Sequence, residues 1–259
     1  MSFRSWLRDA LDVYVQWNWS WTFDAALRYG VVSEQLGRLA SVGVWRICDV
    51  GCGARGGLVN YFQSPIVGVD LNFEPRIVRR FPLCRPVRGS ALALPVGDET
   101  FDVVVCLDVL EHVAAGERTL VVDELFRVVR RSGWVFVGAP CGLEARQAEE
   151  EANALFRRRA GRDHPWLIEH LRNEPLSCEE MGSWISRAAA RRMGEFELRA
   201  FPNTSLALWR RLHRLMWSVP QSIQFQRLLF QPWFAWLKRQ AGPPWYRQVW
   251  SARSSGWGA

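Results

Sequence analysis

The sequence predicts a doubly wound α/β fold, in which a mostly parallel sheet carries helices on both faces. Four short apolar runs, at 45–50, 66–69, 101–107 and 134–139, are each followed by a glycine, an aspartate or a proline. The stretch 117–129, between the last two runs, has the apolar spacing of a helix. Continuous apolar strands that alternate with helices are typical of parallel sheets whose two faces are buried.

The remaining segments extend this sheet and surround it with helices. Residues 1–44 predict an N-terminal helical cap. Residues 45–259 predict the main domain, with a helical lid at 141–192 and a helical insertion at 203–244 before the last strand. In chain order we expect helices over 3–15, 22–40, 144–159, 165–172 and 177–190, a strand over 195–201, helices over 205–217 and 222–238, and a strand over 245–252.

The composition limits the class of protein. With 259 residues, 49% of them hydrophobic and 23% charged, the chain can bury a full core, which excludes a disulfide-stapled miniprotein and a disordered chain. No apolar stretch reaches the roughly 20 residues that cross a bilayer, and the first residues do not resemble a secretory signal. The six cysteines form no CxxC pair, so we expect reduced thiols in a cytoplasmic protein, with zinc or disulfide roles as alternatives.

The positive charge is confined to the end of the chain. The formal net charge is +7, from 33 basic and 26 acidic side chains. Residues 203–259 hold eight basic side chains, no acidic one and seven of the 15 Trp, so the first 202 residues carry 25 basic against 26 acidic groups. The predicted main domain is therefore close to neutral outside its insertion and last strand. If the positive charge binds an anionic partner, the end of the chain is the part that would bind it.

A glycine-rich loop follows the first strand. Gly51, Gly53 and Gly56 have the spacing of dinucleotide-binding loops, in which glycines allow a sharp turn and a close ligand approach. Alone, this pattern would favour an NAD enzyme. Asp49 argues otherwise, because a carboxylate beside the loop repels a pyrophosphate and favours a cationic ligand such as S-adenosylmethionine. Asp70, which ends the second strand, can accept hydrogen bonds from both ribose hydroxyls.

Four ordered segments between residues 45 and 140 form one set of motifs. They are Asp49-Val50-Gly51-Cys52-Gly53 with Val69-Asp70, the run Gly89–Pro95 followed by Phe101–Val105, the run Asp108–Val113, and the helical stretch Glu124–Val129. Together they resemble the motifs of class I S-adenosylmethionine-dependent methyltransferases, and most of all the small-molecule group that includes the ubiquinone-biosynthesis enzymes. The resemblance implies a seven-stranded Rossmann-like sheet that ends in an antiparallel hairpin.

The resemblance also implies which residues hold the cofactor. The chain departs from the family pattern at three places: Arg55 stands where a third glycine is usual, Ser90 stands where an aspartate would bind the adenine amino group, and Arg-Arg-Ser-Gly at 130–133 replaces the usual Lys-Pro-Gly-Gly. Ser90 can still make one hydrogen bond there. The implied cofactor-binding residues are Asp49, Gly51, Cys52, Gly53, Asp70, Leu71, Ser90, Ala91, Leu107 and Asp108.

His112 is the candidate catalytic base. Methyl transfer to a hydroxyl needs a group that removes its proton, and the resemblance places His112 in the first turn after the fourth strand, near the cofactor. The alternative is a helix-start residue that bonds the backbone. Asp108 is a second candidate, although we expect it to line the cofactor pocket. Arg28 and Tyr29, in the helix before the first strand, could reach the methionine carboxylate of the cofactor or face solvent.

The predicted lid contains His164, Glu169 and His170, which could ligate a metal. A simpler interpretation is a helix start, with Asp163 as the cap and Pro165 in the first turn, and we expect no metal site. Because doubly wound folds add substrate lids after the fifth strand, His164 or His170 could instead contact the substrate.

Three interpretations compete for the basic, Trp-rich residues 203–245. Over 206–217 the apolar side chains share one face, and Arg210, Arg211 and Arg214 share another. Such a helix suits an anionic membrane surface or a lipid-linked substrate. Nucleic acid, bound by arginines and stacked aromatics, is the second interpretation and the one we do not expect. The third is a helical insertion that packs over the substrate site with its arginines outward.

The sequence therefore predicts S-adenosylmethionine-dependent methyl transfer to an oxygen or nitrogen of a small molecule, such as a sugar, a lipid precursor or a secondary metabolite. One alternative is a catalytically inactive cofactor-binding module that recruits a partner or a membrane, and another is an NAD-dependent oxidoreductase. The Asn/Asp-Pro-Pro-Tyr motif of amino-directed DNA methyltransferases is absent, since Leu-Asp-Val-Leu occupies 107–110. The sequence names neither the acceptor nor the oligomeric state. We expect a cytoplasmic location, peripheral to a membrane if residues 203–245 bind lipid.

Overall fold

One seven-stranded sheet organises the chain. A computed structural model describes residues 23–39, 45–54, 56–73, 81–218, 236 and 242–255. The strands are β1 (Ile47–Val50), β2 (Ile66–Asp70), β3 (Cys84–Arg88), β4 (Phe101–Leu107), β5 (Val129–Pro140), β6 (Phe196–Ser205) and β7 (Trp245–Ser254). Their order is β3-β2-β1-β4-β5-β7-β6, with β7 antiparallel to both β5 and β6. The predicted mostly parallel sheet with an antiparallel end is confirmed.

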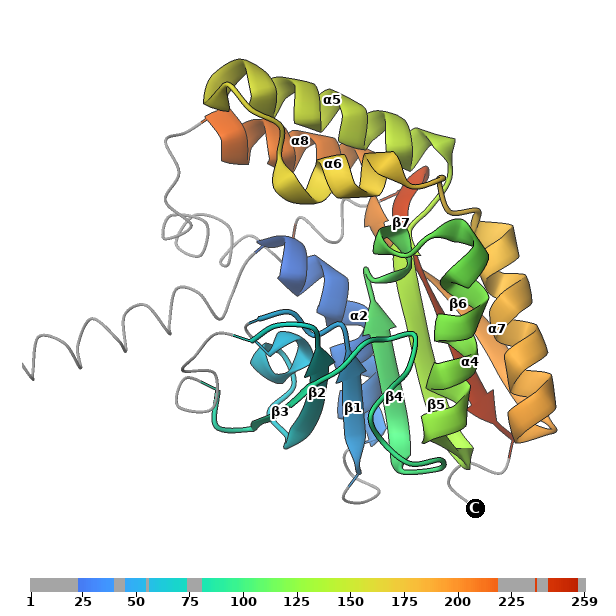
Figure 1. Cartoon of the computed structure of the whole chain (residues 1–259). Coiled ribbons are helices and arrows are strands. Elements are labelled where there is room, and N and C mark those ends of the chain that lie inside the picture. The colour runs from blue at the N-terminus through green and yellow to red at the C-terminus, as the bar shows by residue number, and fades with distance from the viewer. Residues whose placement is uncertain are drawn as a thin grey trace, which may run out of the picture.

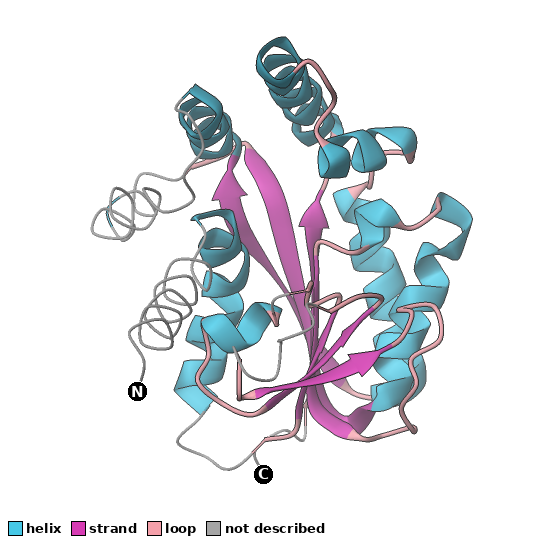
Figure 2. Ribbon diagram, turned by 60° about the vertical axis from the view of Figure 1, so that its left-hand side comes forward, coloured by secondary structure: helices cyan, strands magenta, loops and turns pink. Residues whose placement is uncertain are grey.

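The central strands are buried because helices cover both faces of the sheet (Figures 1 and 2). All four residues of β1 are buried, as are all but Asp102 in β4. On one face the core includes residues of α4 (Arg118–Val128) and α7 (Cys178–Met193). On the other face it includes residues of α2 (Phe23–Leu39) and the short 3-10 helix η2 (Gly57–Asn60). Apolar runs without alternation, the basis of the fold prediction, are what burial on two faces requires.

The edge strand β3 has no counterpart among the apolar runs in the sequence. Arg85, Pro86 and Arg88 interrupt it, so it lacks the continuous apolar pattern of the central strands. It pairs with β2 alone, and an edge position tolerates both charge and proline. Its strand identity therefore comes from pairing with β2 rather than from its own pattern.

Three helices lie at the carboxyl edge of the sheet, above the strand ends in Figure 1. They are α5 (Leu143–Ala160), α6 (Pro165–Arg172) and α8 (Leu206–Ser218). The helix α7 was expected in the lid at 141–192, but Met181, Ile185 and Ala188 bury it against the sheet face. The lid of the described structure is thus α5 and α6. The expected cap of α6 is also wrong, because Asp163 accepts hydrogen bonds from Asn153 and Arg157 instead.

The helix α8 faces the protein with its apolar side. Leu206 and Trp209 join a core cluster with Ala148 and Phe156 of α5. On the same helix, Arg210 pairs with Glu151 of α5 at 3.0 Å. This agrees with the packed-insertion interpretation for residues 206–214. The expected helices over 3–15 and 222–238 lie outside the described residues, apart from Trp236.

Cys141 and Cys178 form a disulfide, which corrects the expectation of reduced thiols throughout. The two residues are 37 apart in sequence, and they join the end of β5 to the start of α7, so the bond closes the loop that carries the lid. Sequence spacing gave no signal, because the pair is neither a CxxC motif nor a member of a cysteine-dense framework. Cys48, Cys52, Cys84 and Cys106 are free and buried.

No helix within the described residues is both long and apolar enough to span a membrane.

Candidate active site

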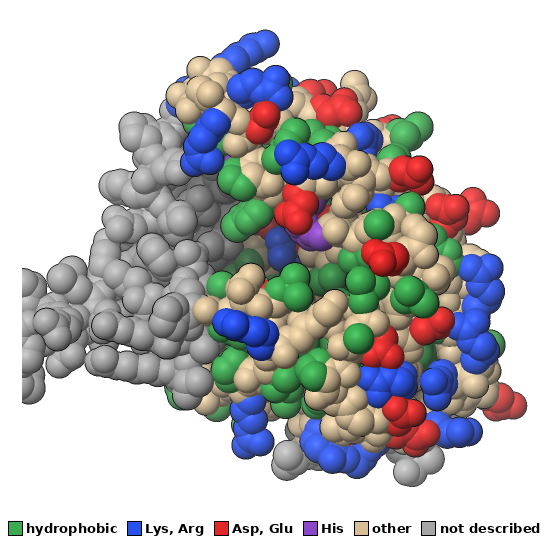
Figure 3. Space-filling view, viewed as in Figure 1, with side chains coloured by type: hydrophobic (Ala, Val, Ile, Leu, Met, Phe, Trp, Pro, Cys, Tyr) green, Lys and Arg blue, Asp and Glu red, His purple; other side chains and the backbone are tan. Residues whose placement is uncertain are grey.

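The candidate site lies where the carboxyl ends of β1, β2 and β4 meet beneath the lid. The strand order reverses at β1, which is paired with β2 on one side and β4 on the other. In open α/β sheets ligands bind at such a switch point, outside the carboxyl ends of the strands. Figure 3 shows a hollow on this face of the molecule, with histidine, acidic and basic side chains along it.

The loop after β1 has the shape of a cofactor cradle. Gly51 and Gly53 have φ values of 71° and 73°, which glycine adopts without strain. The Gly53 N–H donates to the Asp70 carboxylate at 2.8 Å, which ties the loop to the end of β2. A Cβ at Gly53 would meet nothing within 4 Å, and the neighbouring Leu71 side chain is 63% exposed. Open backbone, a carboxylate and an apolar surface are what an adenosine group needs, so these residues fit S-adenosylmethionine.

Asp49 lies beneath this loop and helps to shape it. The residue is fully buried, and its Oδ2 accepts a hydrogen bond from Leu58 N at 2.7 Å. Burial raises the pKa of the Asp49 carboxyl to about 7, although hydrogen bonds from Leu58 and Tyr29 oppose the rise. Its Oδ1 is buried and lacks a hydrogen-bond partner among the described residues. Asp49 is therefore not the simple negative charge expected from sequence, because near pH 7 about half of the molecules carry it in the neutral form.

The other implied cofactor residues divide into those that reach the loop surface and those that support it. Ser90 is half-buried and its Oγ accepts from Leu92 N at 3.2 Å, while Ala91 beside it is also half-buried. Cys52 and Leu107 are buried in the core, at 4% and 0% exposure. Only the backbone of Leu107 is therefore available to a ligand at the end of β4.

Asp108 forms part of a buried charge network. Its carboxylate accepts from Arg247 Nε and Nη2 at 2.7 and 2.5 Å, and it pairs with Arg28 Nε at 3.0 Å. Arg28 and Arg247 also pair with Asp24, at 2.9 and 3.5 Å. These contacts occupy Asp108 and direct Arg28 toward carboxylates of the protein itself. Tyr29 does not face solvent. Its side chain is 2% exposed and forms a hydrogen bond with Asp49.

His112 lies in the short 3-10 helix η3 (Leu110–His112), the predicted turn after β4. Its Nδ1 is 3.1 Å from Glu169 Oε2, and its Nε2 is 3.1 Å from Nε2 of His170 on α6. Burial lowers the pKa of His112, and the neighbouring His170 adds to that effect. Both ring nitrogens therefore have protein partners, and one contact must open before His112 can take a proton from an acceptor.

The structure adds Glu149, Tyr246 and Arg247 to the residues found by sequence. Glu149 Oε1 accepts from Tyr246 Oη at 2.7 Å and is 3.0 Å from His170 Nδ1. Glu149 is the first of three consecutive glutamates, a pattern that is typical of a solvent-exposed helix face. The sequence therefore did not indicate that Glu149 is buried. One feature of the sequence could have indicated that Arg247 is functional: it is a charged residue within the segment 245–252, which was expected to be a strand. His164 does not join this group, since it packs against Phe156 and Trp166.

Comparison with known proteins agrees with this geometry. Residues 48–137 match the family model described as a methyltransferase domain. The ubiquinone biosynthesis O-methyltransferase of Pseudomonas fluorescens is 30% identical over 122 residues, which cover 42% of this chain and 49% of that protein. An uncharacterized protein of Methanocaldococcus jannaschii is 33% identical over 91 residues, 35% of this chain and 37% of the relative. The matches thus span less than half the length of these relatives.

Solved structures share the fold at low sequence identity. The plantazolicin methyltransferase in complex with S-adenosylhomocysteine is 12% identical, with a TM-score of 0.54 over 95% of this chain and 90% of that chain. Together, the sheet order, the loop at the β1 end and the matched residues define the class: the chain contains a methyltransferase domain of the class I S-adenosylmethionine-dependent type, matched over residues 48–137.

Proposed function

We propose that this chain transfers the methyl group of S-adenosylmethionine to an oxygen or nitrogen of a small molecule. The observation that carries the proposal is the hydrogen bond from Gly53 N–H to the Asp70 carboxylate. It holds the open glycine loop and a ribose-binding group together at the switch point of the sheet. When bound, the cofactor supplies an electrophilic methyl group on a sulfonium that leaves as a neutral thioether.

The residues of this chain would bind the two ends of the cofactor differently. The second carboxylate oxygen of Asp70 accepts from Asn72 N at 3.1 Å, and a carboxylate has lone pairs left for ribose hydroxyls. The exposed Leu71 offers apolar surface for the adenine ring, and Ser90 offers one polar contact. Gly53 leaves room for the ligand beside the backbone, whereas Gly51 packs closely against the Val109 side chain. None of these described residues is basic, which supports S-adenosylmethionine over the pyrophosphate of NAD.

Calorimetry with S-adenosylhomocysteine tests cofactor binding. We expect saturable heat with wild type, a loss of about 10- to 100-fold in affinity for Asp70→Ala, and a smaller loss for Asp70→Asn, which keeps an acceptor for Gly53 N–H. Asp123→Ala is the matched control, because Asp123 pairs with Arg191 on an exposed surface. Heat with NAD and none with S-adenosylhomocysteine would support the oxidoreductase alternative instead.

Transfer of a labelled methyl group to sugars, lipid precursors and secondary metabolites tests activity. Turnover with any of them supports the enzyme. Cofactor binding without turnover across a broad acceptor panel would favour the catalytically inactive module. His112 enters here as the proposed base for a hydroxyl acceptor, and His112→Gln should then lower turnover while S-adenosylhomocysteine affinity stays unchanged.

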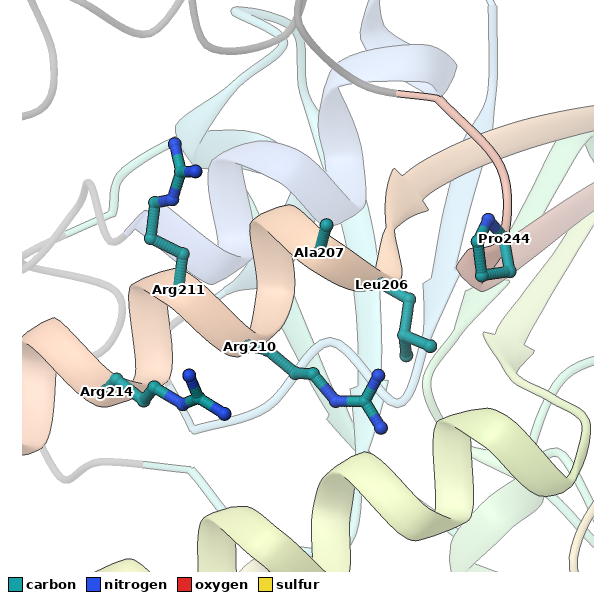
Figure 4. Close-up of a pocket in the computed structure, with 6 residues that line it drawn as sticks. All are labelled: Leu206, Ala207, Arg210, Arg211, Arg214 and Pro244. Carbon is teal, nitrogen blue, oxygen red and sulfur yellow. The ribbon is translucent and has the colours of Figure 1, made fainter.

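The acceptor proposed here carries an anionic group, and the support comes from α8. A cavity of about 620 Å³ beside this helix is lined by Leu206, Ala207, Arg210, Arg211, Arg214 and Pro244 (Figure 4). Arg210, Arg211 and Arg214 bring positive side chains to this cavity, and Arg210 is paired with Glu151. Salt-sensitive flotation with phosphatidylglycerol vesicles would indicate a lipid-linked acceptor. Inhibition by a soluble phosphate ester without flotation would indicate a free anion. If Arg211→Ala with Arg214→Ala changed neither, this part of the proposal would fail.

A further inference from the structure

Two histidines from distant parts of the chain face each other at the carboxyl edge of the sheet. His112 from η3 and His170 from α6 are 58 residues apart in sequence, yet their Nε2 atoms are 3.1 Å apart. Their rings meet edge to face, with centroids 4.4 Å apart and an interplanar angle of 78°. The nitrogen that a histidine commonly offers to a metal therefore lies, in each ring, next to the corresponding nitrogen of the other ring.

The outer nitrogen of each ring is held by a carboxylate. His112 Nδ1 lies 3.1 Å from Glu169 Oε2, and His170 Nδ1 lies 3.0 Å from Glu149 Oε1. Glu149 is itself fixed by the hydroxyl of Tyr246 at 2.7 Å. A carboxylate on Nδ1 places the proton there and leaves the Nε2 lone pair as a ligand, which is the usual outer shell of histidine metal sites. Two facing lone pairs repel unless a proton or a cation lies between them.

A third group completes the set. The Glu111 side chain is 6% exposed, and neither of its carboxylate oxygens has a hydrogen-bond partner in the described residues. The guanidinium of Arg118 donates to the backbone carbonyls of Leu110 and Val113 rather than to this carboxylate. One ligand atom from each of Glu111, His112 and His170 lies within 4.8 Å of the others. As an anion, a buried, unpartnered carboxylate beside two imidazoles is costly unless a proton or a cation neutralises it.

The backbone around these residues is already ordered. Asn173, just after α6, donates through Nδ2 to Glu111 O at 2.9 Å. Arg118 links the same turn to the end of the lid through a hydrogen bond to Glu174 O at 2.5 Å. In a tetrahedral site with bonds of about 2.0–2.1 Å, two nitrogens lie roughly 3.3–3.4 Å apart, close to the observed separation. Small rotations of the Glu111 side chain would bring its carboxylate oxygen, which lies within 4.8 Å of the histidine nitrogens, to bonding distance of the same ion.

We propose that Glu111, His112 and His170 form a binding site for a divalent transition-metal ion, with zinc as the best match. Two imidazoles and one carboxylate are a donor set of zinc sites that keep a fourth position open, whereas magnesium and calcium prefer oxygen ligands alone. The ion would join the lid helix α6 to the turn after β4. With the ion bound, His112 would be a ligand and would not act as the base considered under the proposed function, and the open position would take water or an electron-pair donor of the acceptor. This inference does not depend on methyl transfer, and it replaces the expectation of no metal site.

Zinc titration of chelator-treated full-length protein tests the site. We expect one tightly bound equivalent, a loss of roughly 100-fold or more in affinity for His170→Gln and Glu111→Gln, and a loss of about 10- to 100-fold for Glu149→Gln. His164→Gln is the matched control, because His164 belongs to the same lid and packs on Phe156 outside the site. Each variant is checked by circular dichroism and by S-adenosylhomocysteine binding, which should persist and so separates this test from that of the proposed function.

Cobalt substitution reads out the ligands in wild type and does not require a variant to fold. We expect visible absorption of a tetrahedral cobalt site without the near-ultraviolet charge-transfer bands of a thiolate, and its disappearance on adding zinc. Thiolate bands would assign the metal to a free cysteine and overturn the proposal. Absence of saturable zinc binding, or zinc binding that both Glu111→Gln and His170→Gln leave unchanged, would overturn it as well.

Discussion

Asp108 and Arg247, which are 139 residues apart in sequence, form a two-point ion pair at the candidate site. Nε and Nη2 of Arg247 donate to the two carboxylate oxygens at 2.7 and 2.5 Å, and the Arg247 side chain is 1% exposed. Asp108 has a φ of 57°, unusual for a non-glycine residue. The pair holds this residue at the end of β4 and joins it to the last strand, β7.

Replacing Arg247 with methionine should strongly destabilise the fold. The substitution leaves Asp108 buried with Arg28 as its remaining ion-pair partner among the described residues, so we expect a loss of about 3–5 kcal/mol in the free energy of unfolding, measured by urea denaturation. Arg253→Met is the control, because Arg253 pairs with Glu197 at a partly exposed position and should cost less than about 1 kcal/mol. Equal losses for the two variants would contradict this assignment.

The burial of Asp49 predicts a pH-dependent contribution to stability. Its pKa is about 7 in the folded chain, against an ordinary value of 3.8. The folded chain therefore binds more protons than the unfolded chain between these values, and stability from this group is lost as the pH rises from about 4 to about 7. Asp49→Asn stays neutral throughout. Over this window the stability of wild type relative to Asp49→Asn should fall by at most about 4 kcal/mol, measured by urea denaturation at several pH values. A constant difference would count against a buried, neutral Asp49.

Gly57 should not tolerate a side chain. Its φ is +53°, and a Cβ would lie 2.3 Å from Asp49 Oδ2 and 2.7 Å from the Tyr29 hydroxyl. Gly57→Ala should therefore displace the buried carboxylate that shapes the loop, lowering the free energy of unfolding by about 2 kcal/mol or more and weakening S-adenosylhomocysteine binding. Gly116→Ala provides the comparison, because a Cβ there meets nothing within 4 Å. The loop model fails if both alanine variants behave like wild type.

The disulfide between Cys141 and Cys178 should stabilise the lid and the fold. Thiol titration of the denatured chain should find four reactive cysteines before reduction and six after it. For a loop closed over 37 residues, the double variant Cys141→Ser and Cys178→Ser should lose about 4 kcal/mol in the free energy of unfolding. Reduced wild type should match the variant, and six reactive thiols without reductant would show that the bond is not formed.

The glycine loop and Asp70, the proposed cofactor half of the site, were predictable in position because their signals are local in sequence. The loop from Gly51 to Gly53 and Asp70 each follow an apolar strand, and parallel strands place their carboxyl ends at one edge. The structure also shows what spacing could not. The glycine loop leads into only the short η2, because Gly56 and Gly57 both have positive φ values. The role of Asp49 likewise depends on burial, which a charge count cannot give.

The acceptor half was only partly predictable. His112 and His170 were both singled out from the sequence, but in separate roles, since nothing local relates a turn after β4 to a helix 58 residues later. Glu149 was hidden in a glutamate run, and the Asp108–Arg247 pair connects residues from opposite ends of the domain.

By itself, the sequence determined the layered α/β fold, the glycine loop after the first strand and the confinement of excess positive charge to the last 57 residues. These features follow from the periodicity of apolar residues and from the conformational range of glycine, which act over a few residues. Tertiary structure alone decided which charges pair, which cysteines bond and which histidines face each other. Those outcomes depend on how helices dock across the end of the sheet, where burial makes each polar group find a partner that distance along the chain does not reveal.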